Sequence, residues 1–274
     1  YVSDKVSLIV SAGGNQMTQT NRFNQVAANE LAVPGIYSFN NSNIPLLQNT
    51  FNSKRRINSL YASASIGINN AVYLDITGRN DWASTLPEAN NSYFYPAASL
   101  SLVASELFTL PSAFSFAKLR VGYGQVGNDT DPYSLQPYFQ FLSTPYGTQL
   151  LGTEGNVLPN PNLRPELLTT FEVGTDLRFF NNRLGLDITY YQNTATDQII
   201  SIPVSQTSGF GSKFINAGEI ESKGIEALIN IVPVRTRDFE WSANINFTRA
   251  RSTVVSLTDD LKTYEISNNY LSVQ

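Results

Sequence analysis

The sequence predicts an all-β protein whose antiparallel strands form a segment of a transmembrane β-barrel. Three observations lead to this fold class. Apolar and polar residues alternate with a period of two along many segments, charged residues are scarce, and short connections alternate with long ones. Together these features describe strands with one face toward lipid and the other toward polar surroundings.

The composition indicates that much of the protein surface does not face water. Hydrophobic residues make up 42% of the 274 residues and charged residues only 15%, against a usual charged share of about 25%. The sequence has no run of about 18 apolar residues, which excludes a transmembrane helix. Any contact with a membrane must therefore be made by strands.

Charge and residue usage also exclude several classes of function. The formal net charge is −4, which argues against nucleic acid as a partner, because Lys and Arg must neutralise its phosphates. The chain has no Cys and no His, so it lacks disulfides, thiolate metal ligands and the commonest general base. We therefore expect no enzyme activity, no cofactor and no metal site.

The alternation is clearest in residues 239–248. Its apolar face has aromatic rings at both ends and aliphatic side chains between them: Phe239, Trp241, Ala243, Ile245 and Phe247. Eight further segments follow the same pattern or a weaker form of it: residues 6–10, 60–68, 72–79, 98–102, 119–126, 171–179, 183–190 and 225–231. This gives about nine strands, and only residues 105–110 suggest a turn of helix.

The connections are predicted to alternate in length. Short ones fall at Asn69-Asn70 and Asn181-Asn182, where Asn tolerates the left-handed backbone of a tight turn, and at residues 104–114 and 233–238. Long polar segments lie between them, at residues 14–55, 80–93, 127–167 and 192–222. A transmembrane barrel has this arrangement, with short periplasmic turns at one rim and long extracellular loops at the other.

A soluble β-sandwich also alternates apolar and polar residues, because one face of each sheet is buried. A sandwich gives no reason for aromatic rings at strand ends or for loop lengths that differ between the two rims. A bilayer gives a reason for the rings, since its two interfaces favour amphipathic aromatic side chains. The barrel is the better interpretation.

Short motifs occur in order between residues 57 and 256. They are residues 73–82 (YLDITGRNDW), 91–96 (NSYFYP), 118–120 (KLR), 125–133 (QVGNDTDPY), 160–166 (NPNLRPE), 179–187 (FFNNRLGLD), 215–220 (INAGEI) and 223–226 (KGIE). Together they resemble the SusC/RagA family of TonB-dependent outer-membrane transporters.

The resemblance implies a barrel of about 22 strands closed by a plug, of which residues 1–274 form a partial barrel domain. The plug and the TonB box are missing, and Tyr1-Val2-Ser3-Asp4-Lys5 predicts no signal peptide, so we expect a fragment. The resemblance also implies an outer-membrane location in a Gram-negative, Bacteroidota-like bacterium. It further implies uptake of oligosaccharides or peptides, energised by the TonB complex, with a SusD-like surface lipoprotein. The alternative function is a soluble or surface-bound β-rich carbohydrate-binding or adhesin module.

One long segment carries the candidate residues for binding a substrate or partner. These are the rings Tyr133, Tyr138, Phe139, Phe141 and Tyr146. Loops on a rigid barrel often carry recognition, although the same rings could only pack the loop against its neighbours.

Three further features bear on chemistry. Asp129-Thr130-Asp131 supplies too few carboxylates to specify a cation and is better explained as a turn. Residues 209–213 lack the spacing of a phosphate-binding loop. One set of charged residues is predicted to face the lumen and to pair across strands or to contact the plug: Asp75, Arg79, Glu172, Asp176, Arg178 and Asp187.

Overall fold

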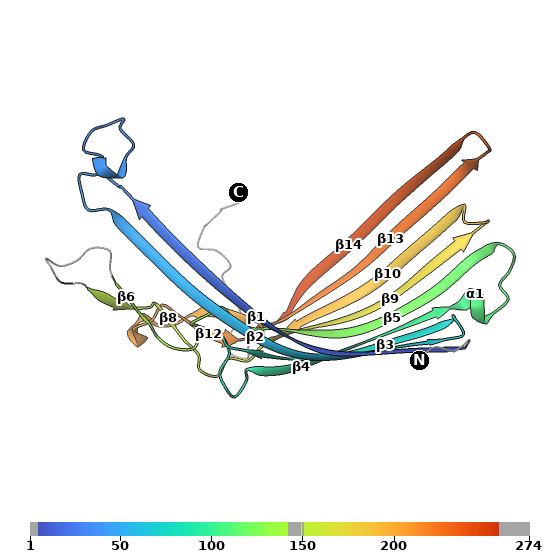
Figure 1. Cartoon of the computed structure of the whole chain (residues 1–274), viewed down its shortest axis with the longest axis horizontal. Coiled ribbons are helices and arrows are strands. Elements are labelled where there is room, and N and C mark those ends of the chain that lie inside the picture. The colour runs from blue at the N-terminus through green and yellow to red at the C-terminus, as the bar shows by residue number, and fades with distance from the viewer. Residues whose placement is uncertain (1–4, 142–148, 150, 258–274) are drawn as a thin grey trace.

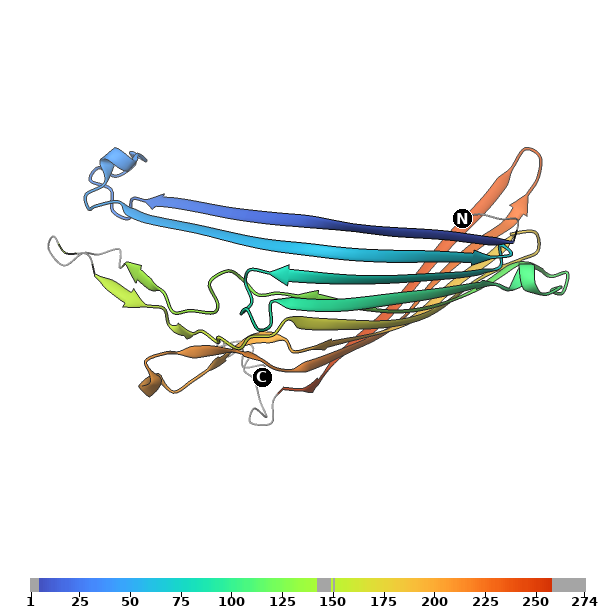
Figure 2. The ribbon, with the colours of Figure 1, turned by 60° about the horizontal axis from the view of Figure 1, so that its bottom comes forward.

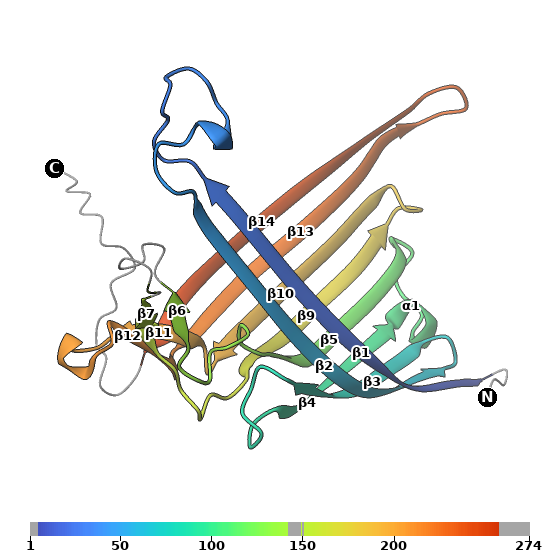
Figure 3. The same ribbon diagram turned by 60° about the vertical axis from the view of Figure 1, so that its left-hand side comes forward.

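The computed structural model describes residues 5–141, 149 and 151–257, with the side chains of Gln140 and Phe141 left out. Nine strands form one antiparallel sheet in the order β1-β2-β3-β4-β5-β9-β10-β13-β14, which confirms the predicted fold class. The strands are β1 (Val6–Ala27), β2 (Leu47–Ile68), β3 (Val72–Ala83), β4 (Ser92–Val103), β5 (Phe114–Asn128), β9 (Glu166–Phe179), β10 (Leu184–Thr196), β13 (Glu219–Arg235) and β14 (Glu240–Ser256). The sheet curves into an open trough, with β1 and β2 in one wall and β13 and β14 in the other (Figures 1 and 3).

The two ends of the sheet differ in their connections (Figure 2). The short-turn end carries residues 69–71, 104–113, 180–183 and 236–239, and the long-loop end carries residues 28–46, 84–91, 129–165 and 197–218. The predicted Asn turns are confirmed, since Asn69, Asn70, Asn181 and Asn182 all have positive φ angles between 52° and 63°. The expected helical turn is the short helix α1 (Ala104–Leu107).

Two predictions about the connections are wrong. Residues 14–55 are not a loop, because β1 continues to Ala27 and β2 begins at Leu47. Both faces of these extensions are mostly polar, with scattered apolar residues such as Phe23 and Phe51, so the alternation that marks a strand is lost. The lengths also fail to alternate strictly, since the connection 84–91 is shorter than the connection 104–113, which contains α1.

Smaller elements lie within the two longest connections. A hairpin is formed by β6 (Phe139–Phe141) and β7 (Gly152–Glu154), and a three-stranded sheet by β8 (Val157–Leu158), β11 (Ile199–Pro203) and β12 (Ser212–Asn216). Two 3₁₀ turns, η1 (Phe39–Asn41) and η2 (Gln206–Ser208), complete the described elements. These elements gather at the long-loop end of the sheet (Figure 2).

The strand register divides the sheet into an apolar face and a polar face. Residues that pair across neighbouring strands point to the same face, so each face can be followed from β1 to β13. One row of the apolar face contains Leu8, Ile66, Leu74, Leu100, Val121, Val173, Tyr190 and Ile225. The next row, on the polar face, contains Ser65, Asp75, Ser99, Gly122, Glu172, Tyr191 and Gly224.

The apolar face is wide enough to match a membrane. In β9 the rings of Phe171 and Phe179 bound a segment of nine residues, and a tilted strand needs about 9–11 residues to cross a bilayer. The apolar band of an outer-membrane barrel is about 25 Å tall, with aromatic residues at both edges. Large apolar side chains such as Ile188, Ile225 and Ile245 remain exposed on this face, as lipid contact requires.

Six of the nine buried apolar side chains in the described residues lie toward the long-loop end: Ile57, Ala83, Leu86, Leu163, Ile202 and Ala217. Ile57, Ala83, Leu86 and Leu163 form a core, with Tyr93, Leu135, Ile199 and Phe214 packed around it. The core joins the middle of β2 and the end of β3 to the connections 84–91 and 129–165. It fixes the loops relative to the sheet.

We expect Ala243→Arg to destabilise the assembled barrel and Asn244→Arg to have little effect. Ala243 lies on the apolar face between Trp241 and Phe247, whereas Asn244 lies on the polar face opposite Asn230. Arg at the middle of the lipid face costs about 2–4 kcal/mol, while a lumen position tolerates charge. The free energy of unfolding of the complete protein, measured by urea titration in lipid vesicles, checks this. Equal losses in the two variants would mean that the faces are assigned wrongly.

Candidate functional site

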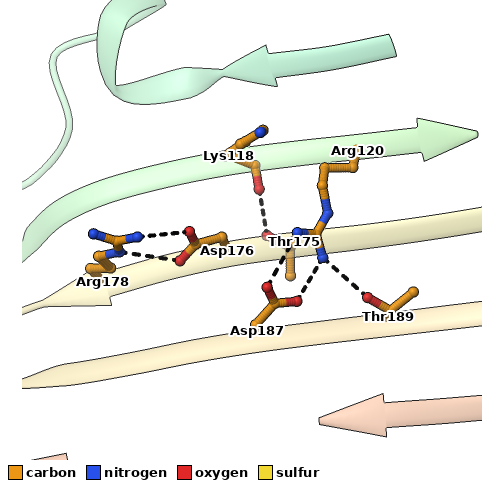
Figure 4. Close-up of polar contacts among 7 residues, drawn as sticks. All are labelled: Lys118, Arg120, Thr175, Asp176, Arg178, Asp187 and Thr189. Carbon is orange, nitrogen blue, oxygen red and sulfur yellow. Dashed lines mark hydrogen bonds and ion pairs between the residues drawn. The ribbon is translucent and has the colours of Figure 1, made fainter. Parts of the chain in front are cut away.

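The polar face carries a charge network that spans three strands (Figure 4). Arg120 of β5 donates from Nη2 to Asp187 Oδ1 at 2.6 Å and to Thr189 Oγ1 at 3.1 Å, both on β10. The strand between them, β9, contributes Gly174, which pairs with Arg120 on one side and with Thr189 on the other. The guanidinium therefore reaches across an entire strand.

Gly174 is what permits this reach. A Cβ atom at Gly174 would lie 2.9 Å from Arg120 Nη2 and 3.0 Å from Thr189 Oγ1, closer than such atoms normally approach. Gly122 lies on the same face, and a Cβ atom there would meet nothing within 4 Å. A side chain at position 174 would therefore displace Arg120 and Thr189, whereas one at position 122 would displace nothing.

The charged set predicted to face the lumen lies on the polar face, where carboxylates and guanidinium groups meet within and across strands. Asp187 pairs with Arg120, a residue that the predicted set omitted, and Asp75 accepts a hydrogen bond from Ser65 Oγ at 2.5 Å. Arg178 and Asp176 pair within β9 at 3.2 Å, and Arg178 also lies 5.1 Å from the centre of the Phe116 ring. These contacts give the polar face a fixed pattern of hydrogen-bonding groups suited to a water-filled lumen.

A second cluster of polar side chains lies on the polar face, near the long-loop end. Asp81 accepts hydrogen bonds from Arg79 Nε at 2.8 Å and from the Tyr95 hydroxyl at 2.8 Å. Arg79 also donates to Ser59 Oγ at 2.9 Å. The side chains of β2, β3 and β4 are thereby joined just below the loops.

The Asp129-Thr130-Asp131 segment is a structural turn. The Asp129 side chain is fully buried, forms an ion pair with Arg55 and accepts a hydrogen bond from Thr85 Oγ1 at 2.5 Å. Ser134 Oγ donates to the Asp131 carbonyl at 2.9 Å and closes the turn. Within the described ranges, no group of three or more Asp or Glu side chains could hold a metal ion.

One asparagine joins the two longest connections. Asn216 Nδ2 donates to the carbonyl oxygens of Arg164 at 2.8 Å and Asp197 at 2.9 Å, and Asn216 Oδ1 accepts from the Arg164 amide at 2.8 Å. Arg164 and Asp197 also form an ion pair at 2.5 Å. The motifs at residues 160–166 and 215–220, which lie far apart in sequence, therefore meet in space. These contacts join the connections 129–165 and 197–218, which together form one loop body.

The predicted recognition rings lie on this body but do not all fall within the described residues. Phe139 is 78% exposed, Tyr138 is 51% exposed and Tyr133 is 53% exposed with a φ angle of 71°. Tyr138 also lies over the backbone of Gly155. The side chain of Phe141 and all of Tyr146 lie outside the described residues. The β6–β7 hairpin that carries Phe139 projects beyond the strand ends (Figure 2).

The connection 28–46 presents exposed apolar side chains that were not among the predicted recognition residues, because the segment was expected to be a polar loop. Tyr37 is 91% exposed, and Val33, Ile36 and Phe39 are about half exposed. Asn41 orders this tip by donating to the carbonyl oxygens of Val33 at 2.8 Å and Ile36 at 2.7 Å. The run of apolar residues between polar neighbours was the signal available in the sequence.

Residues 209–211 complete the turn between β11 and β12, and residues 212–213 begin β12, so this segment is not a phosphate-binding loop. Gly209 has a φ angle of 86° and ends η2, and the Gly211 amide donates to the Asn156 carbonyl at 2.9 Å. The described part of the chain contains no helix long and apolar enough to cross a membrane.

The apolar outer face, the polar inner face and the unequal ends define this chain as part of an outer-membrane β-barrel. Residues 5–272 match the family described as TonB dependent receptor-like, beta-barrel. The chain belongs to this family of Gram-negative outer-membrane proteins, which are not enzymes, and it is similar to transporters of the SusC/RagA type.

Individual relatives agree with the family match. Over 208 residues the chain is 32% identical to TonB-dependent receptor P3 of Formosa agariphila, covering 74% of this chain and 20% of that protein. It is 26% identical to TonB-dependent receptor SusC of Bacteroides thetaiotaomicron, covering 82% of this chain and 24% of that protein. The chain thus spans about a fifth to a quarter of these relatives.

A solved structure shows the same fold. The RagAB peptide transporter superposes with a TM-score of 0.83 at 20% identity, over 97% of this chain and 30% of that chain. This likeness covers the whole curved sheet. It confirms the barrel architecture inferred from the strand register.

We expect Gly174→Ala to weaken the sheet relative to Gly122→Ala. In most strands Ala is preferred to Gly, so Gly122→Ala should be neutral or slightly stabilising. A Cβ atom at position 174 would instead displace Arg120 from Asp187, a half-exposed pair worth about 0.5–1 kcal/mol. Unfolding free energies of both variants, with and without Asp187→Asn, measure the coupling. We expect Gly174→Ala to cost less stability in the Asp187→Asn background than in the wild type. An equal cost in the two backgrounds would mean that Gly174 has no role in the ion pair.

Proposed function

We propose that this chain is the partial barrel domain of a TonB-dependent transporter that imports oligosaccharides or peptides across the outer membrane. The observation that carries the proposal is the pairing of a barrel of the SusC/RagA type with a rigid, ring-bearing loop body at one rim. The complete barrel would have about 22 strands and a plug. Uptake would depend on the TonB complex.

We infer a SusD-like surface lipoprotein as the partner at the long-loop end. Two separate connections there expose aromatic rings to water, Tyr37 and Phe39 in one and Tyr138 and Phe139 in the other. Exposed rings on ordered loops are typical of protein and sugar recognition. RagAB, whose barrel has the same fold, is a peptide transporter, which supports a peptide as one of the two substrate classes.

The alternative function, a soluble carbohydrate-binding or adhesin module, is less well supported. The apolar face would then have to be covered by protein, whereas side chains such as Ile76, Ile188 and Ile245 are exposed in the described residues. A detergent-independent, monomeric form of the complete protein would favour that alternative.

The direction of the barrel can be tested with single cysteines at Thr153 and Asn182. Both residues are exposed, at the long-loop and short-turn ends respectively, and this chain contributes no native Cys. We expect an impermeant maleimide to label Thr153→Cys on whole cells. Asn182→Cys should be labelled only after the outer membrane is permeabilised. The reverse pattern would place the long loops in the periplasm.

The recognition rings can be tested by Tyr138→Ala/Phe139→Ala in the complete transporter. Removing two exposed rings from a binding surface should weaken capture of substrate or lipoprotein about tenfold, without loss of assembly. Phe108→Ala/Phe180→Ala removes two comparably exposed rings at the opposite end and serves as the control. Uptake of labelled oligosaccharides and peptides, and co-purification of the lipoprotein, are measured. Normal uptake and normal co-purification in the first variant would assign these rings to loop packing.

A further inference from the structure

We propose that the outer face of β1 and β2 holds a phosphorylated lipid of the outer leaflet. The phosphate would contact a basic ladder, defined as Arg22, Lys54 and Arg56. An acyl chain would lie in a groove of small side chains directly below the ladder. This proposal rests on the outer-membrane location and on the outward position of the long-loop end, but not on transport.

The ladder lies on the lipid-facing side of the sheet. Lys54 and Arg56 are in register with the even-numbered residues of β2, which include Leu60 and Ile66 of the apolar face. Lys54 and Arg56 are exposed themselves, as is Leu60 farther along the same face at 60%. The inward residues Ile57 and Ser59 are only 8% and 3% exposed. Arg55, which points inward, is paired with buried Asp129 and takes no part in the ladder.

The three bases form one patch. Lys54 and Arg56 are two residues apart on one strand face, which separates their Cα atoms by about 7 Å. Arg22 of β1 is paired with Asn52, so it is a diagonal neighbour of Lys54. Their long side chains can therefore reach a single phosphate group together.

No carboxylate among the residues that the structure describes neutralises this patch. Residues 6–29 and 31–74 contain neither Asp nor Glu, so β1 and β2 carry no acidic side chain at all. Glu30, between these stretches, accepts a hydrogen bond from Asn43 within its own connection. None of the ion pairs in the described part of the chain includes a ladder residue. Three unpaired bases are notable in a chain with a net charge of −4.

The groove lies on the same face, nearer the centre of the membrane. It encloses a volume of about 520 Å³, and its lining includes Ala12, Leu60, Ala62, Gly78 and Phe94. Leu60 is four residues along β2 from Arg56, a distance of about 13 Å toward the short-turn end. An acyl chain can occupy the groove while its phosphate lies beside the ladder.

Position and charge together identify the ligand as an anionic lipid. A cationic patch above an apolar surface attracts phosphate headgroups, with about 1 kcal/mol for each Lys or Arg. In the outer leaflet of an outer membrane, lipid A supplies both phosphates and acyl chains. An acidic protein partner would not use the apolar groove.

The test is a native mass spectrometry titration of the complete transporter, purified in neutral detergent and freed of lipid. The probes are bis-phosphorylated lipid A and the same lipid without phosphates. We expect Lys54→Gln/Arg56→Gln to weaken binding of the phosphorylated lipid about tenfold or more. The control, Arg183→Gln/Arg237→Gln, removes two charges at the short-turn end and should leave binding unchanged.

A third variant, Ala62→Leu, fills the groove without changing charge and should weaken binding of the phosphorylated lipid. Urea unfolding of each variant verifies that the barrel is assembled. Wild-type affinity in Lys54→Gln/Arg56→Gln would overturn the proposal, as would an equal loss in the control or equal binding of the two lipids. Unchanged binding in Ala62→Leu would overturn the placement of the acyl chain. Because binding is measured without uptake, failure here is separate from failure of nutrient import.

Discussion

Within the hydrocarbon of a membrane, every backbone amide and carbonyl group must find its partner inside the protein, because no water is present to replace it. This chain meets that requirement for its seven inner strands by pairing them on both sides in one continuous antiparallel sheet, of which β1 and β14 are the edges. The pairing fixes the register, and the register fixes which side chains face lipid. The division into a lipid face and a lumen face therefore depends on this pairing of the backbone. A slip of one residue in any strand would turn its apolar side chains toward the lumen.

The polar face shows how such a sheet handles charge. Arg120 reaches Asp187 across β9, and the missing side chain of Gly174 provides the room. At the long-loop end, buried Asp129 pairs with Arg55 of β2 and anchors one connection to the sheet, and Asn216 joins the two longest connections to each other. These contacts hold the connections in place above a lumen lined with hydrogen-bonding groups. Rigid rims allow loops to carry recognition without destabilising the strands.

The sequence was most informative where local rules determine the structure. Alternation predicted the strands, and paired asparagines predicted two turns whose backbone requires positive φ. It was least informative in the outer halves of β1 and β2. Both faces of these strands are mostly polar there, so apolar and polar residues do not alternate. Contacts between distant segments, such as Asn216 with Arg164, depend on the register of several strands at once. The role of Gly174 was hidden for the same reason, because its neighbours lie on β5 and β10.

The most direct test of this account is the environment of consecutive residues along an interior strand. Spin labels placed one at a time at positions 184–191 of β10, in the complete protein reconstituted in lipid, report access to oxygen in the bilayer and to a water-soluble relaxant. The register predicts high oxygen access at Leu184, Leu186, Ile188 and Tyr190, and high access to the aqueous relaxant at the positions between them. A uniform profile, or one with the two sets exchanged, would contradict the division into lipid and lumen faces on which the structure depends.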